Sequence, residues 1–232
     1  MPRKKTLPLC ASCPVEPGEK ICRHEKGKAG KACPTLTHAK TLQASRKEYK
    51  KPKIRKFARN ASIQEAQCFS HDPKNPGVLT TVKPRIVEIC EFAKKMDYKR
   101  LGIAFCNGVR KEASVVEQIF KVNGFEVVSV ICKAGRTPKE ELGITEEEKI
   151  EPGKYEVMCN PINQAMILNE EKTDFNVAIC LCVGHDSLFF KYSKAPVTVL
   201  AAKDRLTGHN PLAPIYTVHA YYRRLVQRGY QS

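Results

Sequence analysis

Apolar runs and amphipathic segments alternate along the chain from Thr80 onward. Four short apolar runs have the length and composition of buried strands, at residues 101–105, 125–131, 177–181 and 196–201. Segments with helical spacing of apolar residues precede the first run and separate the others. This order is typical of a parallel sheet with helices on its faces. The pattern therefore predicts an α/β fold over residues 80–232, with a Rossmann-like parallel sheet.

The first 79 residues follow a different pattern. Residues 7–36 are rich in Gly, Pro, Lys and Cys and lack hydrophobic periodicity, so they cannot bury much of a core by themselves. Residues 38–67 have helical character that is interrupted at Lys51-Pro52, and a loop is predicted at 71–77. We therefore divide the chain into three parts: a cysteine-rich module (1–36), a basic helical connector (37–79) and the α/β domain (80–232).

Cysteine is frequent, with 11 in 232 residues. The N-terminus is basic, but no apolar stretch of signal-peptide length follows it, and no segment approaches the ~20 apolar residues that span a bilayer. We therefore expect a cytoplasmic protein that makes no membrane contact. Thiols stay reduced in that compartment, so metal or thiol chemistry explains the cysteines better than a disulfide framework, and their odd number points the same way.

A first set of cysteines lies within one polar segment and consists of Cys10, Cys13, Cys22 and Cys33. Four thiolates complete the tetrahedral shell of zinc, or supply one ligand to each iron of a four-iron cluster. Structural zinc sites usually have two C-x2-C pairs, whereas here one pair is followed by two separate cysteines. The set predicts that residues 1–36 form a metal-binding module that the metal organises. The alternative is four incidental reduced thiols.

A second set emerges from the predicted fold, because each member follows a strand or an extended segment: Cys106, Cys132, Cys159 and Cys182. Parallel strands end at one edge of a sheet, and ligands of open parallel sheets bind at that carboxyl edge. The four thiols can therefore meet around one cofactor. We favour a 4Fe-4S iron–sulfur cluster over zinc, because these ligands come from loops. The alternative is that they are ordinary buried cysteines.

The remaining three cysteines are assigned to structure. Cys90 belongs to an apolar helical stripe and Cys68 precedes a loop. Cys180 lies two residues before Cys182 and fills the core, with service as a substitute ligand as the alternative.

Several polar residues accompany the second set. His185 and Asp186 stand at a predicted helix start, and Lys203, Arg205 and His209 follow the last strand. The candidate catalytic residues are His185, Asp186 and Lys203. The imidazoles of His185 and His209 can ligate or transfer protons, and the cations can hold an anionic substrate. The alternative is that Asp186 caps its helix and the basic side chains are solvated. Whether the protein is an enzyme stays open.

Positive charge is concentrated at the N-terminal end. Residues 1–59 contain 17 Lys and Arg against four Asp and Glu, out of a net charge of +16 for the whole chain. Such an arm attracts nucleic acid or another polyanion. The alternative is that it balances bound metal, since four thiolates around zinc leave a charge of about −2. We do not favour nucleic acid, because no aromatic-interleaved RNA signature or recognition-helix motif is present.

Several short blocks of the chain are distinctive when taken together: Cys10-Ala11-Ser12-Cys13, Cys33-Pro34-Thr35, Cys159-Asn160-Pro161-Ile162, Leu181-Cys182-Val183-Gly184-His185-Asp186, Lys203-Asp204-Arg205 and His209-Asn210-Pro211. Together they resemble one family, the domain of unknown function 1847 family of uncharacterised cysteine-rich proteins. The resemblance implies metal binding and nothing more specific.

These observations favour a metal-binding protein, specifically an iron–sulfur protein with redox or sulfur-handling chemistry and an unidentified redox or small-molecule partner. One alternative is a zinc-binding structural or regulatory protein whose basic arm binds nucleic acid or a protein partner. A metal carrier is a third interpretation.

Overall fold

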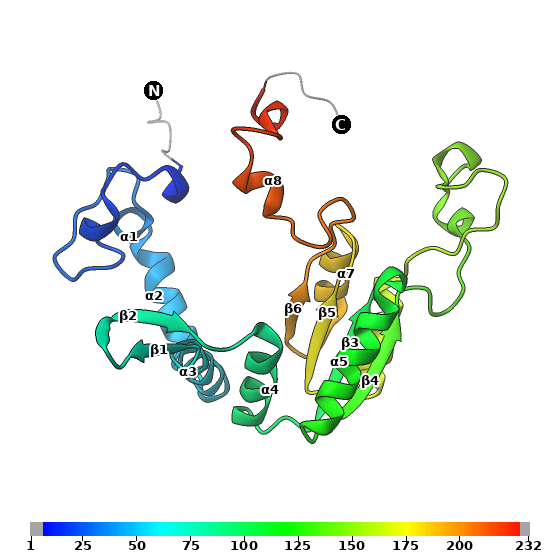
Figure 1. Cartoon of the computed structure of the whole chain (residues 1–232), viewed down its shortest axis with the longest axis horizontal. Helices are drawn as coiled ribbons and strands as arrows, with labels where there is room; N and C mark the ends of the chain where they lie inside the picture. Colours follow the sequence, from blue (N-terminus) through cyan, green and yellow to red (C-terminus); the bar gives the residue numbers. More distant parts are fainter. Residues whose placement is uncertain (1–6, 228–232) are drawn as a thin grey trace. The chain divides into compact units, whose positions relative to one another are not determined.

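The computed structural model describes residues 7–227, which fall into two compact units divided between Ile63 and Gln64. We call these the N-terminal unit and the α/β unit (Figure 1). The division lies within the segment predicted as a connector.

The N-terminal unit is built from short elements and two longer helices. The predicted break at Lys51-Pro52 separates the two longer helices, because proline lacks an N–H and fits only the first turn of a helix. From residue 7 to residue 59 no residue is fully buried. The elements are two 3-10 helices (Cys10–Ser12 and Pro17–Glu19), α1 (Pro34–Thr37), α2 (Ala39–Glu48) and α3 (Pro52–Ala66), the last of which continues into the α/β unit.

A β-hairpin follows α3, formed by β1 (Phe69–Asp72) and β2 (Asn75–Thr81). The loop predicted at residues 71–77 was therefore wrong. The hairpin turns where the Lys74 N–H donates to Asp72 Oδ1 at 2.7 Å. Almost all of its residues are exposed, so the strands lack the apolar alternation by which a half-buried strand is recognised.

The main sheet has four parallel strands in the order β4-β3-β5-β6. A mixed α/β fold with a parallel sheet and flanking helices is thus confirmed. The predicted strands match the observed ones to within two residues at each end, because each is a largely apolar run between polar segments. The strands are β3 (Arg100–Phe105), β4 (Glu126–Ile131), β5 (Phe175–Ile179) and β6 (Val197–Ala201).

Helices cover both faces of this sheet. On one face, α5 (Arg110–Val122) lies across β3 and β4, and its Glu117 accepts a hydrogen bond from Ser129 at 2.8 Å (Figure 1). The opposite face is covered by α6 (Pro161–Glu170) and α7 (His185–Tyr192). Two further helices are α4 (Arg85–Lys95), which precedes β3, and α8 (Ala213–Tyr216), which follows β6. The core between the sheet and α6–α7 consists of Ala104, Val130, Ala165, Leu168, Ala178, Leu181 and Phe189.

Gly102 on β3 lets the α6–α7 layer approach the sheet closely. A Cβ atom at this position would lie 2.0 Å from Asn176 Oδ1 and 3.0 Å from Leu168 Cδ1. Asn176 is fully buried, accepts a hydrogen bond from Thr173 at 2.7 Å and donates one to Ser193 at 2.9 Å. The absence of a side chain at residue 102 therefore makes room for a buried polar network between β5 and the end of α7.

A charged excursion joins β4 to α6. Its two ends meet at a bridge between Pro138 and Val157, where the Lys139 N–H donates to Glu156 O at 2.9 Å. Inside it, the ammonium of Lys149 contacts Glu140 and Glu146, each at 2.5 Å, and the side chain of Lys149 is only 3% exposed. The excursion is thus closed at its base and has its own internal ion pairs.

Among the helices of residues 7–227, none is long and apolar enough to cross a membrane.

Candidate metal centre

Main-chain hydrogen bonds place Cys106 and Cys132 at the carboxyl edge of the sheet. These residues directly follow β3 and β4. The Cys106 N–H donates to Ile179 O at 3.1 Å, and the Cys132 N–H donates to Phe105 O at 2.9 Å. Both cysteines therefore continue the hydrogen-bond ladder of the sheet by one residue, and this ladder fixes the positions of their Cα atoms.

Cys159 and Cys182 reach the same edge from loops. Next to Cys159, the Asn160 N–H donates to Cys132 O at 2.8 Å, while its side chain accepts the Asn163 N–H at 2.9 Å and caps α6. The carbonyl of Cys182 accepts the N–H of His185 at 3.0 Å, which ties it to the first turn of α7. The starts of two helices therefore hold these two cysteines.

The turn into Cys182 is strained. Cys180, directly after β5, has a left-handed backbone with φ of 52°, and Gly184 has φ of 84°. A non-glycine residue in this region costs about 1–2 kcal/mol. Cys180 is kept there by its N–H, which donates to Ala201 O at 2.8 Å, and by burial of its side chain. The left-handed conformation ends the extended strand at Cys180, and Cys182 lies two residues later among the residues that line the cysteine cavity.

The four cysteine side chains of the second set line one small cavity. The empty volume between them is about 190 Å³, and no part of it is wide enough for a water molecule. The other lining residues are Pro161, Gln164, Leu181 and His185.

Cys132 is the centre of a small thiol network. Its Sγ atom lies 3.8 Å from Cys159 Sγ and accepts the Asn107 N–H at 3.3 Å. Hydrogen bonding to Cys132 lowers the pKa of Cys106 to about 4 and that of Cys159 to about 5. Hydrogen bonding with Cys106 and Cys159, together with burial, raises the pKa of Cys132. The lowered pKa values of its two neighbours favour the thiolate, which is the form of cysteine that binds metal.

Two cations from the loop after β6 lie beside these sulfurs. Arg205 Nη2 donates to Cys182 Sγ at 3.1 Å, and this bond raises the pKa of Arg205. Lys203 lies beside Cys106 and adds to the lowering of its pKa that Cys132 causes. Their two positive charges match the charge of about −2 that four thiolates leave around zinc or a four-iron cluster.

Two polar atoms near the cysteines have no hydrogen-bond partner. They are Gln164 Oε1 and His185 Nδ1, the only buried side-chain nitrogen or oxygen atoms in that condition among residues 7–227. Both residues line the cysteine cavity. Buried polar atoms are almost always paired, so it is notable that both unpartnered atoms belong to residues lining this one cavity.

The donor chemistry of the cavity fits a thiophilic metal group. Two sulfurs of a tetrahedral shell with bonds of ~2.3 Å lie about 3.8 Å apart, and Cys132 and Cys159 have that spacing. Yet within residues 7–227, no three Cys, His, Asp or Glu side chains are grouped so that they could hold a metal ion. The thiols are placed as neighbours around a cavity, and a bound group would have to draw or spread them into its own geometry.

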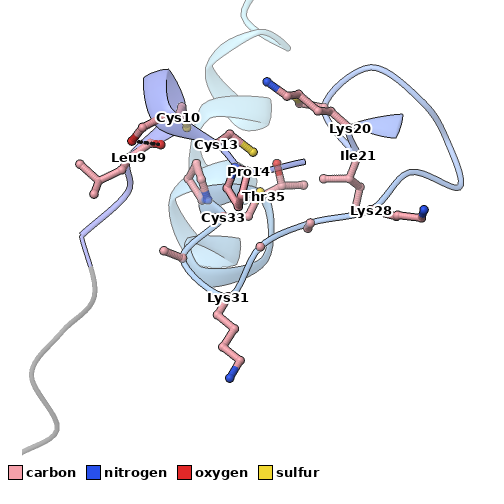
Figure 2. Close-up of a pocket in the computed structure, with 16 residues that line it drawn as sticks. Leu9, Cys10, Cys13, Pro14, Lys20, Ile21, Lys28, Lys31, Cys33 and Thr35 are labelled. Carbon is pink, nitrogen blue, oxygen red and sulfur yellow. Dashed lines mark hydrogen bonds between the residues drawn. The ribbon is translucent and has the colours of Figure 1, made fainter. Parts of the chain in front are cut away.

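The first cysteine set also surrounds a single pocket. Cys10, Cys13, Cys22 and Cys33 all line a cavity of about 340 Å³ in the N-terminal unit, and Figure 2 shows three of them on the segments around it. Cys10 and Cys22 are exposed and the other two half-exposed. Hydrogen bonding from Thr35 lowers the pKa of Cys33. Both predicted sets are thus brought together, each within its own unit.

The remaining candidates lie elsewhere. Asp186 does not line the cysteine cavity, and its carboxylate accepts the N–H of Ser187 at 2.7 Å. His209 accepts the Asp204 N–H at 3.2 Å in the loop after β6. Cys68 and Cys90, assigned to structure, are buried.

Comparison with known proteins yields two matches. Residues 33–200 match a family described as "Protein of unknown function (DUF1847)". Over 218 residues the chain is 39% identical to "Uncharacterized protein MJ0455" of Methanocaldococcus jannaschii, an alignment that covers 94% of this chain and 98% of the relative. The chain belongs to the DUF1847 family. The resemblance seen in the sequence is thereby confirmed.

The DUF1847 match contains most of the cavity described above. Its range, 33–200, includes all four cysteines of the second set together with Gln164 and His185. Lys203, Arg205 and three of the four N-terminal cysteines lie outside it. The range matched by the DUF1847 family therefore contains the whole cysteine cavity of the α/β unit, but only one of the four N-terminal cysteines.

Sequence reasoning missed Gln164 in this DUF1847 chain. The helical spacing of the sequence could have revealed it, because Gln164 falls on the same buried face of α6 as Pro161, Ala165 and Leu168. A polar residue on an otherwise apolar helix face is buried only for a reason, so it deserved inclusion in the candidate set.

Proposed function

We propose that this protein binds a metal cofactor through Cys106, Cys132, Cys159 and Cys182, with a 4Fe-4S cluster as the favoured group. One observation carries the proposal: thiols from four separate segments, as many as 76 residues apart, line one cavity at the carboxyl edge of a parallel sheet. Chance burial of cysteines does not account for four of them at one point of the fold.

Electrostatics supports the same conclusion. Because the pKa values of Cys106 and Cys159 are lowered, protons compete only weakly with a metal for these two sulfurs at neutral pH. Lys203 and Arg205 supply the compensating positive charge. An iron–sulfur cluster in this place would provide redox or sulfur-handling chemistry, and the chain would bind it, balance its charge and shield it from water.

The choice of cluster over zinc rests on how the donors are distributed. Four ligands of a cluster bind four different irons, so they do not need to converge on one point. Within residues 7–227 no three potential ligands are grouped so that they could hold a metal ion. Cysteines that come from separate loops are typical of such a ligand set, whereas structural zinc sites use pairs that are close in sequence. Binding of a cluster would require Cys132 Sγ and Cys159 Sγ, which lie 3.8 Å apart, to separate.

Anaerobic purification followed by measurement of iron, zinc and acid-labile sulfide tests the proposal. We expect iron and sulfide in similar amounts, with a visible absorption band that Cys106→Ala, Cys132→Ala, Cys159→Ala and Cys182→Ala each weaken or abolish. The buried Cys90 serves as the matched control, and Cys90→Ala should leave the band unchanged. A colourless protein with zinc alone would overturn the cluster, and a protein without metal at these cysteines would overturn the function.

We assign the N-terminal cysteines to a second, structural metal site, as an iron–sulfur cluster or zinc. Support comes from Cys10, Cys13, Cys22 and Cys33 lining one pocket in a segment without a buried core. This assignment makes residues 1–36 a metal-binding module, in addition to the centre of the α/β unit.

The second candidate function is a zinc protein whose basic arm binds nucleic acid. It is favoured by a groove on α2–α3 where Tyr49 lies with Arg55 and Arg59, since bases stack on aromatic rings and arginine planes. Titration with labelled RNA or DNA at low and moderate salt distinguishes the candidates. Tight binding by a colourless protein would favour this function, whereas weak binding that salt abolishes would leave the arm as a charge-balancing element.

A further inference from the structure

Two of the cavity sulfurs are in direct contact. Cys159 Sγ lies 3.8 Å from Cys132 Sγ, although the two residues are 27 positions apart in the chain. The cavity beside them has no part wide enough for a water molecule, so no solvent separates the two atoms. Cys132 and Cys159 therefore form a pair of touching thiols that the fold brings together from the two ends of the charged excursion.

The main chains that carry these two thiols are also neighbours. The Asn160 N–H donates to Cys132 O at 2.8 Å, and main chains joined by such bonds in a sheet are ~4.8 Å apart. A disulfide joins Cα atoms that are about 4.4–6.8 Å apart. Formation of an S–S bond of ~2.0 Å would require the sulfurs to approach by about 1.8 Å, which side-chain rotation can supply. The fold thus places two free thiols within reach of one disulfide.

The two cysteines differ in their exposure to solvent. Cys132 is only 3% exposed, whereas Cys159 is half-buried. A reagent in solution would therefore reach Cys159, and Cys132 could react only with a partner that already lies inside the fold. Cys106, the other cysteine that is hydrogen-bonded to Cys132, is itself buried and so is no better reached. This asymmetry suits an attacking thiol paired with a resolving thiol.

We propose that Cys159 and Cys132 form a thiol–disulfide exchange pair, in which Cys159 attacks small-molecule disulfides and Cys132 resolves the product. The Cys159 thiolate attacks one sulfur of a disulfide R–S–S–R and expels the other as the thiolate RS⁻. Cys132, as its thiolate, then attacks Cys159 Sγ and expels the second RS⁻. The two protons of the protein thiols pass to the two leaving thiolates. In total, two protein thiols lose two electrons and become one disulfide, and the reagent is reduced to two thiols.

This inference goes beyond the proposed function, because it needs neither a metal nor any other occupant in the narrow cavity. The disulfide would link the residue that follows β4 to a residue just before α6, at the base of the charged excursion. It would also use two of the four sulfurs proposed as metal ligands, so oxidation and metal binding at this cavity would exclude one another. Where thiols are kept reduced, such a disulfide is transient and serves catalysis or redox sensing.

The test uses the full-length protein, reduced with dithiothreitol and treated with a chelator until it holds no measurable metal. It is incubated with glutathione disulfide, quenched with acid, digested without reduction and analysed by mass spectrometry. We expect a cross-linked pair of peptides that contain Cys132 and Cys159 and that separate again on treatment with dithiothreitol. Cys22, an exposed cysteine of the same chain, reports that the reagent has reacted.

Single variants separate the two roles, and circular dichroism checks that each variant folds. In Cys132→Ser, Cys159 should accumulate as a mixed disulfide with glutathione, because the resolving thiol is gone. In Cys159→Ser, Cys132 should stay reduced, because it is buried. Cys90→Ala, which changes a buried cysteine outside the cavity, should form the cross-link as the wild type does. The inference would be overturned by a wild-type protein in which both thiols stay reduced after Cys22 has reacted, or in which Cys132 pairs with Cys106 instead.

Discussion

The two cysteine sets differ in what holds them in place. The N-terminal set lies within residues 10–33, in a stretch without a fully buried residue, and its pocket has a volume of about 340 Å³. The set in the α/β unit is spread from Cys106 to Cys182, but strand ladders and helix starts hold its members around a narrow cavity. Under the proposed function, bound metal would organise the N-terminal segment, whereas in the α/β unit the fold already positions the cysteines.

This contrast has an energetic side. A structural metal can contribute about 10–16 kcal/mol to a small domain that is unfolded without it. The α/β unit already has a hydrophobic core, formed between the sheet and α6–α7. Removal of metal should therefore affect the two units to very different degrees.

If the proposed metal sites exist, the largest effect of metal removal is expected in the N-terminal unit. Chelation, or the variants Cys13→Ala and Cys33→Ala, should unfold residues 7–36, because no apolar core replaces the metal. Limited proteolysis with mass spectrometry should show cleavage confined to this segment. Ser12→Ala, which changes a neighbour in the same pocket, is the control. Equal protease resistance with and without metal would remove the contrast between the two sets.

A smaller effect is expected when the α/β unit is strained. In Gly102→Ala the new Cβ would lie 2.0 Å from Asn176 Oδ1, so the layers must separate. Overpacking of this kind costs about 1–3 kcal/mol. Chemical denaturation followed by circular dichroism measures the loss. Gly77→Ala, where nothing lies within 4 Å, should be close to neutral.

Gly102→Ala also tests whether the two cysteine sets bind metal independently of one another. Metal content at the cavity cysteines should fall in Gly102→Ala, while the N-terminal site keeps its metal. Parallel loss at both sites would show that the two sets depend on one another.

The smallest effect concerns protonation of the metal-free protein. The pKa values of Cys106 and Cys159 lie at about 4 and about 5, below the 9.0 of an ordinary thiol. Their thiolate forms therefore stabilise the folded unit at high pH, and this contribution is lost progressively as pH falls from 9.0, the ordinary thiol pKa, until it is gone below about 5 and then 4. Ultraviolet thiolate absorbance should show two thiolates at pH 6 that disappear as the pH falls below the pKa values of Cys159 and Cys106. The titration should be unchanged in Cys90→Ala, and two fully protonated thiols at pH 6 would contradict the network.

Much of the fold was accessible from the sequence because the two central strands of the sheet are buried on both faces. The residues of β3 and β5 form continuous apolar runs between polar segments, which are easy to delimit. Placing cysteines after such runs was enough to anticipate which four would face one cavity. Parallel strands end at a common edge of the sheet, so residues that directly follow them are expected to be neighbours.

What the sequence did not disclose depends on tertiary context. The β1–β2 hairpin has exposed strands, so no pattern of burial marks it. The left-handed backbone of Cys180 is set by its bond to β6 and by burial, and not by any local preference of cysteine. The orientation of Gln164 becomes visible only once its Nε2 is seen to donate to Val130 O and Phe105 O, which shows which way the amide points.

The charged excursion between β4 and α6 has a consequence for protein engineering. Its ends are joined at the Pro138–Val157 bridge, and the Met158 N–H donates to Thr137 O at 2.9 Å, just before Cys159. Because the chain leaves and returns at one closed base, the number of residues beyond the base is uncoupled from the position of Cys159. The tip of the excursion is thus an insertion point where a peptide tag or a fluorescent reporter can be spliced into the chain without displacing the cysteines.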